Sequence, residues 1–176
     1  KTQNLKFGEA VKFLANLAGM SAYTFSKQDE EREKKWKEYS SIYNQYVNFY
    51  HDEILKSQDS KFAREYLKKR NLTKNEVLKF KVGHVKEKPN FYKTLKDQFS
   101  DESLIESGLF YFDEKNKTYV ERFKNRIIFP INNISGQPIA LGGRTFEDKS
   151  FLAKYINSPE TLFFKKGFNL YNLDHS

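Results

Sequence analysis

The fold class follows from residues 126–144, which read Arg-Ile-Ile-Phe-Pro-Ile-Asn-Asn-Ile-Ser-Gly-Gln-Pro-Ile-Ala-Leu-Gly-Gly-Arg. The first part is rich in β-branched and aromatic residues, residues 132–136 are typical of a turn, and an apolar run then returns. This pattern predicts two antiparallel strands joined by a tight turn. Pro130 and Pro138 have no amide hydrogen to donate, so we expect them at a sheet edge or a bulge.

Shorter elements precede these two strands. Residues 109–112 and a second arm starting at Thr118 predict a hairpin whose tip is residues 113–117, and Gly108 ends the segment before it. The upstream pattern predicts a strand over residues 80–85 and short helices over residues 90–99 and 101–107.

Residues 28–79 have the pattern of helices. A largely aromatic stripe recurs there at three- and four-residue steps, and it comprises Trp36, Tyr39, Tyr43, Tyr46, Phe49, Tyr50 and Ile54. Such a stripe predicts an amphipathic helix, over about residues 30–55, that packs against the core. Stacking of bases on these rings, or docking of a partner protein, is the alternative.

Another helix is expected after residues 57–60. The side chains predicted to face inward are Phe62, Ala63, Tyr66 and Leu67. The cations near its end suit the negative pole of a helix dipole, and they are Lys68, Lys69 and Arg70. Residues 73–76, Thr-Lys-Asn-Glu, predict a capping box that starts a further short helix. Residues 8–18 predict a short helix that Gly19 ends.

These elements predict an α+β protein in which N-terminal helices precede a small, mostly antiparallel sheet with short helices. The length of 176 residues suits one domain. The chain has no Cys, which excludes a disulfide scaffold and a Cys-ligated zinc or iron–sulfur site within it. No apolar run is long enough to span a bilayer and no signal-like segment opens the sequence, so we expect an intracellular domain with no membrane partner.

The balance of charge is basic. Lys and Arg number 31 against 23 for Asp and Glu, giving a formal net charge of +8. This excess is spread along the chain, so a solvated surface accounts for most of the lysines. A polyanionic partner is the functional alternative.

Sites for catalysis are few. His51, His84 and His175 are isolated in the sequence, which predicts neither a metal cluster nor a Ser-His-Asp arrangement. There is no P-loop, and no Asp-x-Asp occurs. We therefore expect that this chain does not hold magnesium unaided.

Three cations alternate at Arg122, Lys124 and Arg126. On an extended chain they would project from one face, because successive side chains of a strand point to opposite sides. One hypothesis is a basic track along a phosphodiester backbone. The alternative is an exposed strand face that protects a sheet edge.

A second basic segment lies downstream. Residues 142–144, Gly-Gly-Arg, would allow a ligand to approach the backbone while Arg144 offers two parallel donors to a phosphate. Lys154, Tyr155 and Asn157 then supply a cation, an aromatic plane and an amide within four residues. Together they would suit single-stranded nucleic acid, whereas a structural turn at residues 157–159 is the competing explanation.

At these residues the chain resembles bacterial DNA primases of the DnaG type. The matching motifs are Arg126-Ile-Ile-Phe-Pro-Ile131, Ile139-Ala-Leu-Gly-Gly-Arg144, Lys154-Tyr-Ile-Asn-Ser-Pro-Glu-Thr161, Phe164-Lys-Lys-Gly167 and Leu170-Tyr-Asn-Leu173. Upstream matches are Ala63-Arg-Glu-Tyr-Leu67, Arg70-Asn-Leu72 and Phe80-Lys-Val-Gly83, and residues 7–15 resemble the helix that closes the family's zinc-binding domain.

The resemblance implies an enzyme that makes short RNA primers from ribonucleoside triphosphates on single-stranded DNA template at the replication fork, in the bacterial cytoplasm. Its partners would be the RNA–DNA hybrid, the replicative helicase and single-strand-binding protein. It implies that residues 1–25 are a remnant of the zinc-domain helix plus a linker and that residues 26–176 are the basic N-terminal subdomain of the catalytic core. Magnesium ligands would belong to a following TOPRIM fold and zinc ligands to the preceding domain, so this chain alone is expected to be inactive.

The resemblance also assigns residues. Arg122 and Lys124 match basic positions that lie beside template DNA in the family. Together with Arg126 they are the DNA-binding candidates that precede the motif at residues 154–161. The matches to the single-strand-contacting motif are Lys154, Tyr155 and Asn157. The matches to basic residues of the active-site cleft, where nucleotide phosphates or the hybrid would pass, are Arg64, Arg144 and Lys166.

Two glycines of the family pattern are replaced here, by Asn71 and Asn172. Asn tolerates a left-handed backbone better than most residues, so we expect the fold to survive. Two other functions stay open on the sequence: a non-enzymatic domain that binds single-stranded nucleic acid, and a protein-interaction module built on the stripe from Trp36 to Ile54.

Overall fold

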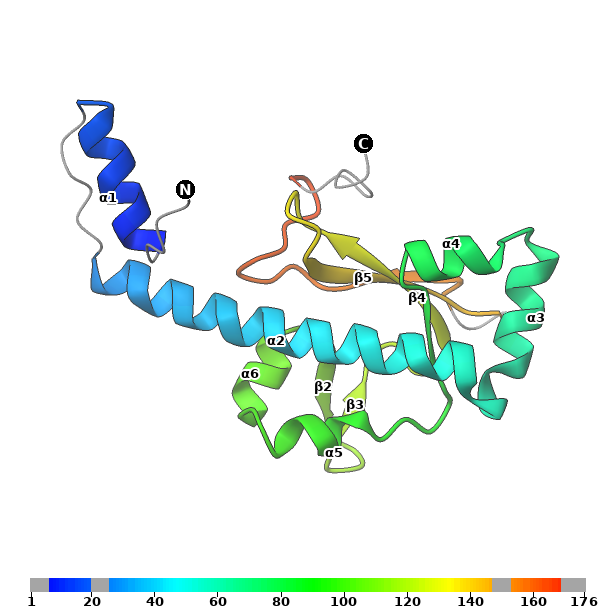
Figure 1. Ribbon diagram of the computed structural model, residues 1–176. Coiled ribbons are helices and arrows are strands. Elements are labelled where there is room, and N and C mark those ends of the chain that lie inside the picture. Colours follow the sequence, from blue (N-terminus) through cyan, green and yellow to red (C-terminus); the bar gives the residue numbers. More distant parts are fainter. Residues whose placement is uncertain (1–6, 20–25, 147–152, 169–176) are drawn as a thin grey trace. The chain divides into compact units, whose positions relative to one another are not determined.

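A computed structural model describes residues 7–19, 26–146 and 153–168 (Figure 1). The chain divides into two compact units, Lys1–Lys37 and Glu38–Ser176. The first unit contains α1, Phe7–Leu17, and the start of α2, Lys27–Lys56. The predicted helix at residues 8–18 is confirmed, and Gly19 follows it with a left-handed φ of 64°. The predicted domain boundary after residue 25 stays a prediction.

In the second unit, α2 packs its aromatic stripe inward, as predicted. The stripe residues that are buried are Tyr39, Tyr43, Tyr46, Tyr50 and Ile54. Two of the tyrosine hydroxyl groups reach distant segments: Tyr39 donates to the Ile139 carbonyl at 2.6 Å and Tyr43 to the Ser107 carbonyl at 2.9 Å. A buried tyrosine usually finds such a partner for its polar end. Through these contacts, α2 connects segments of the unit that are far apart in sequence.

A turn of 3-10 helix, Gln58–Ser60, leads from α2 into α3, Lys61–Lys69, which is followed by α4, Lys74–Lys79. The predicted capping box is present, since Thr73 accepts from the Glu76 amide and the Glu76 carboxylate accepts from the Thr73 amide. Asn71 lies between the helices with φ 60°, the left-handed conformation expected where the family pattern has glycine.

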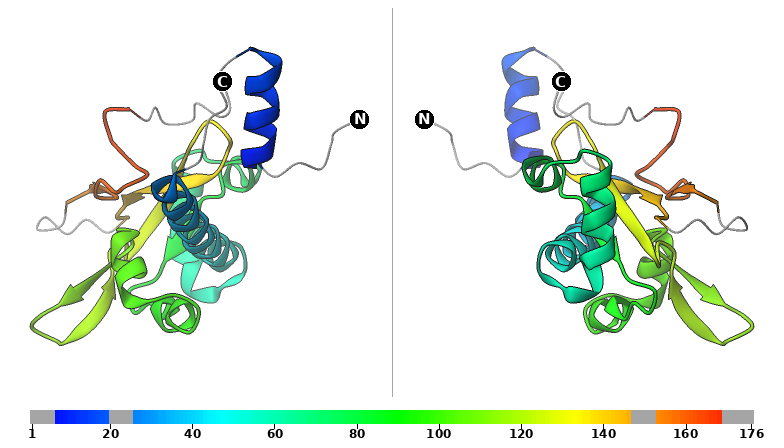
Figure 2. Two further views of the ribbon diagram at one scale, coloured as in Figure 1. Left: turned by 90° about the vertical axis from the view of Figure 1, so that its left-hand side faces the viewer. Right: turned by 90° about the vertical axis from the view of Figure 1, so that its right-hand side faces the viewer.

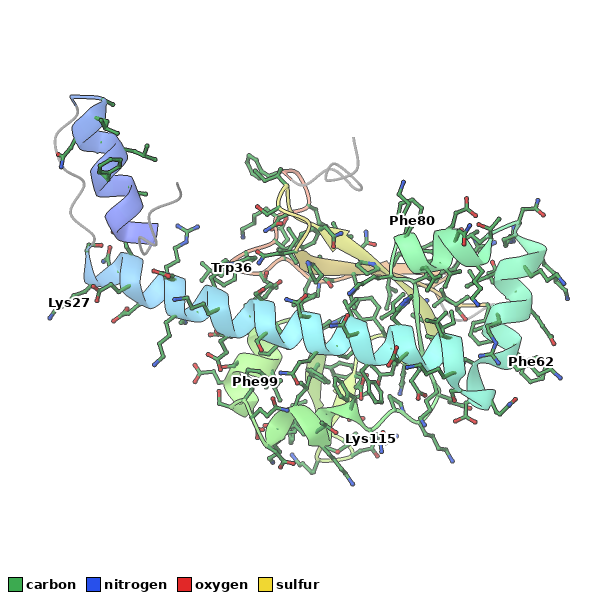
Figure 3. The ribbon with its side chains drawn as sticks, viewed as in Figure 1. Lys27, Trp36, Phe62, Phe80, Phe99 and Lys115 are labelled. Atoms are coloured by element: carbon green, nitrogen blue, oxygen red, sulfur yellow. The ribbon has the colours of Figure 1, made fainter. Side chains whose placement is uncertain are left out.

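The prediction that Phe62 faces inward is wrong. Its side chain is 71% exposed and projects from α3 into solvent (Figure 3), whereas Ala63 and Leu67 are buried. One helical position corresponds to about 100° of rotation, so a short helix that buries positions 63 and 67 turns position 62 away from the core.

Four antiparallel strands form the main sheet in the order β1-β4-β5-β6. Their bounds are Gly83–Val85, Arg126–Asn132, Pro138–Arg144 and Tyr155–Asn157. The predicted pair, β4 and β5, forms its centre. β1 pairs only with residues 126–128, so Pro130 lies beyond the end of that neighbour, and the register shifts where Asn132 faces Pro138. The prediction of an edge or bulge at the two prolines is therefore confirmed.

The strand predicted over residues 80–85 is shorter than expected. It begins at Gly83, because Phe80 ends α4 and Lys81 takes a left-handed φ of 46°. A Cβ at Gly83 would lie 3.0 Å from the Tyr50 carbonyl carbon and closer still to Ile128. The absence of a side chain there is what lets β1 lie against α2.

The remaining elements lie on the other side of α2 from the main sheet (Figure 1): α5, Phe91–Lys96; α6, Asp101–Glu106; and the hairpin of β2, Phe110–Asp113, with β3, Thr118–Glu121. The hairpin projects from the unit (Figure 2). Buried Glu121 accepts hydrogen bonds from the Tyr50 hydroxyl at 2.6 Å and the Phe91 amide at 2.8 Å, which joins β3, α2 and α5. The α+β architecture predicted from the sequence is confirmed, and no helix among the described residues is long and apolar enough to cross a membrane.

Candidate nucleic-acid interface

The end of β5 carries an arginine held between two aromatic rings. Arg144 and Tyr155 face each other across β5 and β6, and the guanidinium carbon lies 4.9 Å from the centre of the Tyr155 ring. The Tyr66 ring of α3 lies 5.2 Å from the same carbon. A cation between two rings is attracted to both faces and loses rotational freedom. We call Tyr66, Arg144 and Tyr155 the arginine stack.

The arginine stack leaves donors of Arg144 available. Its Nε atom is buried and has no hydrogen-bond partner in the described part of the chain. A buried donor without a partner is costly, and because this atom has almost no accessible surface, any ligand would have to meet the other guanidinium nitrogens. A guanidinium offers several donors in a fixed plane, which matches the oxygens of a phosphate.

Sequence reasoning assigned no role at the site to Tyr66 or Arg70. The guanidinium carbon of Arg70 lies 5.5 Å from the centre of the Tyr66 ring, so this ring contacts two cations. The signal was the four-residue spacing of Tyr66 and Arg70 on a helix, which places them on one face. The sequence analysis explains the position of Arg70 only by the dipole of the helix.

Three predicted residues gather beside the arginine stack on or before β6. Tyr155 is 60% exposed, and Lys154 and Asn157 are exposed on either side of it. Asn157 faces Gly142 across the strand pair. A Cβ at Gly142 would meet the Asn157 amide oxygen at 3.4 Å and the Phe129 carbonyl oxygen at 3.9 Å, so this part of the surface has room. The ring and amide expected from the sequence therefore lie two residues apart on one strand, and the cation directly precedes that strand.

The competing explanation, a turn at residues 157–159, is wrong because no turn forms there, yet the residues after Asn157 do have structural contacts. The Ser158 hydroxyl accepts from the Leu141 amide at 2.9 Å, and the Thr161 hydroxyl lies 3.0 Å from that of Tyr39. Pro159 packs so closely on Gly108 that a Cβ there would lie 2.7 Å from its ring. In the segment 154–161, residues up to Asn157 are therefore mostly exposed, whereas Ser158 and Thr161 after it are buried and have a structural role.

The prediction that Arg122, Lys124 and Arg126 project from one extended face is wrong. β3 ends at Glu121, and residues 122–125 form a turn in which Asn125 has φ 56°. The reason is Phe123, which is buried against Gly143; a Cβ at Gly143 would lie 2.5 Å from its ring. Burying that ring turns the chain between the two strands.

The three cations have separate environments. Arg122 donates from Nε to the Gly108 carbonyl at 2.8 Å and lies over the Tyr111 ring at 5.5 Å, while Lys124 is exposed. Arg126 is only 7% exposed and donates to the Ala153 carbonyl at 2.8 Å. Burial lowers the pKa of Arg126. Its geometry indicates support of the segment before β6 rather than contact with a ligand.

Arg64 and Lys166 are not joined to the arginine stack. Nη1 of Arg64 donates to the carbonyls of Ile54 at 2.9 Å and Ser57 at 2.8 Å, where it satisfies acceptors at the end of α2. Lys166 is exposed, and its backbone amide donates to Glu160 at 3.1 Å. Gly143 has a packing role against Phe123, so of the two glycines only Gly142 leaves room for a ligand. Asn172 lies outside the described residues.

The chain is similar to known proteins along most of its length. Residues 49–176 match the family described as the DNA primase catalytic core, N-terminal domain. A DNA primase of Lactococcus lactis is 35% identical over 170 residues, which is 96% of this chain and 26% of that protein. The chain thus spans about a quarter of this curated relative.

Solved structures are also similar. A DnaG primase catalytic domain bound to single-stranded DNA has a TM-score of 0.70 at 29% identity, covering 81% of this chain and 44% of that one. The zinc-binding and RNA polymerase domains of the Aquifex aeolicus primase give 0.69 at 26% identity, covering 97% of this chain and 40% of that one. From the match over residues 49–176, the chain belongs to the family of the N-terminal domain of the DNA primase catalytic core.

Proposed function

We propose that this chain holds single-stranded template DNA in a primase, a nucleotidyltransferase that synthesises short RNA primers for replication. The observation that carries the proposal is the arginine stack with Lys154 and Asn157 beside it. The single-stranded DNA bound to a similar primase domain supports it. The chain spans about a quarter of a curated primase, so the activity is assigned to the whole enzyme.

Each side chain would have a distinct task. Arg144 and Lys154 would bind backbone phosphates, the exposed face of Tyr155 would stack on a base, and the Asn157 amide would donate to or accept from a base edge. Lys124, and the Nη atoms of Arg122, would extend the basic surface toward the hairpin. Phosphate binding and ring stacking carry little sequence information, which suits a protein that must move along any template.

The metal chemistry of the parent enzyme is assigned elsewhere. Magnesium would neutralise charge during phosphoryl transfer, but among the described residues no group of three His, Cys, Asp or Glu could hold a metal ion, so they do not fit such a site. Zinc ligands are likewise assigned to another domain of the parent, since the chain has no Cys. What this chain would supply is cations near the nucleotide phosphates or the RNA–DNA hybrid, from Arg144 and Lys166.

The partners of the parent enzyme follow from the family. We expect it to use ribonucleoside triphosphates in the cytoplasm at the replication fork and to meet the replicative helicase and single-strand-binding protein there. The chain alone is expected to bind single-stranded DNA and to make no primer. Primer synthesis by the isolated chain with magnesium and nucleotides would contradict this division of labour.

The test is a fluorescence-anisotropy titration of a labelled 20-nucleotide single strand at two salt concentrations. Replacing Arg122, Lys124 and Lys154 together by Ala should weaken binding by at least about tenfold and reduce its salt dependence. In a matched control variant, Ala replaces Lys61, Lys93 and Lys115, three exposed lysines outside the proposed binding surface. It loses the same charge and should bind nearly as well as the parent chain. Equal loss in both variants would mean that net charge, and not this surface, binds the strand.

A further inference from the structure

A cavity of about 790 Å³ lies between the end of α2 and helices α3 and α4, the three helices at the right of Figure 1. None of the three residues of the arginine stack lines this cavity. Tyr66 belongs to the stack, whereas Leu67 and Lys68 line the cavity. The same short helix therefore presents two different surfaces.

The floor of the cavity is apolar. Ile54, Leu67 and Val77 line it, and all three are buried members of one hydrophobic cluster. Leu72 also lines it and packs against that cluster while remaining partly exposed. The volume is within the range of ligand pockets and is larger than one side chain requires.

The charged residues that line the cavity are all cations: Arg64, Lys68 and Lys74. No Asp or Glu lines it, and in the described part of the chain neither Lys68 nor Lys74 has an ion-pair partner. Arg64 is fixed in place by its bonds to the Ile54 and Ser57 carbonyls. An apolar floor under a rim of one sign favours a ligand with apolar groups and negative charge.

Nucleic acid fits this lining poorly. Single strands are bound by aromatic rings on which bases stack, and no aromatic residue lines the cavity. A protein segment with acidic and bulky aliphatic or aromatic side chains matches both the floor and the rim. We propose that this cavity is a docking site for an acidic protein segment that inserts apolar side chains, so that the chain holds a protein partner and a nucleic acid on different surfaces at once.

The experiment selects displayed random ten-residue peptides on the immobilised 176-residue chain and measures the selected peptides in solution by fluorescence anisotropy. The expected peptides contain several Asp or Glu with at least one Leu, Ile or Phe. Replacing Lys68 and Lys74 together by Ala should weaken the binding of these peptides about tenfold. Replacing the apolar residues of the peptide by Ser should weaken binding by a similar factor. The control variant, Lys61→Ala with Lys93→Ala, removes two exposed lysines outside the cavity lining and should bind normally.

A saturating single-stranded oligonucleotide should leave peptide binding unchanged. The proposal is overturned if no peptide is enriched, if the enriched peptides lack acidic or apolar residues, or if the two double variants bind equally. Competition by the oligonucleotide would also overturn it, because the cavity would then belong to the nucleic-acid surface. Both variants alter only exposed lysines, so circular dichroism should give the parent spectrum for each.

Discussion

Tyrosines occupy two regions of this protein in opposite ways. Along α2, Tyr39, Tyr43 and Tyr50 are buried, and their hydroxyl groups bond to groups of the protein itself. In the arginine stack, Tyr66 and Tyr155 hold a cation between their rings, and Tyr155 keeps most of its surface exposed. The difference teaches that strand register and helix face, rather than aromatic content, separate a buried ring from an exposed one.

The largest effect should come from the core region. Tyr43→Ala removes a side chain with no exposed surface and should lower the free energy of unfolding by about 4 kcal/mol. Tyr43→Phe removes the bond to the Ser107 carbonyl and the contact with the Ser158 hydroxyl at 3.3 Å, and it should cost about 1 kcal/mol. Urea unfolding followed by circular dichroism measures both. If Tyr155→Ala is as destabilising as Tyr43→Ala, the two regions do not differ as described.

A second test uses His84, which is buried on the face of the sheet next to α3. Its Nδ1 lies 2.8 Å from the Ser60 hydroxyl, and burial lowers the pKa of His84 to about 4, aided by Arg64 and opposed by Asp59. The neutral ring is favoured in the folded state, so its stabilisation is present above pH 6.5 and is lost as the pH falls toward 4. The loss should be on the order of 3 kcal/mol or less.

The control for that test is His84→Gln, measured over the same pH range. Burial raises the pKa of Glu121, which therefore changes stability in the opposite sense as the pH falls. Both proteins contain Glu121, so the difference between their pH profiles reports His84 alone. Parallel profiles would contradict the assignment of a buried neutral histidine.

The ring of Tyr155 should matter for binding and little for folding. Tyr155→Ala should weaken binding of single-stranded DNA by about tenfold, because stacking on one aromatic ring is worth roughly 1–3 kcal/mol. Tyr155→Phe should bind like the parent chain, since the ring face remains. Anisotropy titration measures both, and a loss in the Phe variant would shift the role from the ring to the hydroxyl.

The smallest effect is expected at Phe62. The ring is 71% exposed, so Phe62→Ser should change the free energy of unfolding by less than about 0.5 kcal/mol. Its neighbour Ala63 has no exposed surface, and Ala63→Ser would bury a hydroxyl at a greater cost. Urea unfolding of the two variants compares an exposed and a buried position on one helix. Equal losses would show that Phe62 is packed after all.

Much of the fold could be predicted because local patterns and tertiary packing agree. Three features were predictable from residues that are close together in sequence. They are the two strands joined by residues 132–136, the buried stripe on α2 and the capping box at Thr73. The prediction for Phe62 is wrong because the stripe that α3 buries runs through Ala63 and Leu67, and residue spacing alone does not show on which side of that stripe Phe62 lies.

The site could be predicted only in part. Lys154, Tyr155 and Asn157 are neighbours in sequence and all three are exposed, and their contact with nucleic acid stays a prediction. The alternation of Arg122, Lys124 and Arg126 suggested one strand face, but burial of Phe123 against Gly143 turns the chain there, and this contact joins residues far apart in sequence. Tyr66 of α3 reaches Arg144 at the end of β5, a contact that no local pattern encodes.

The central claim is that Arg144, held between Tyr66 and Tyr155, binds a phosphate of single-stranded DNA. Arg144→Gln should weaken binding about tenfold and reduce the slope of log affinity against log salt by roughly 0.7, the value for one phosphate of a single strand. The free energy of unfolding, measured on the same sample, should change by less than about 1 kcal/mol. An unchanged affinity and salt slope in this folded variant would contradict the account.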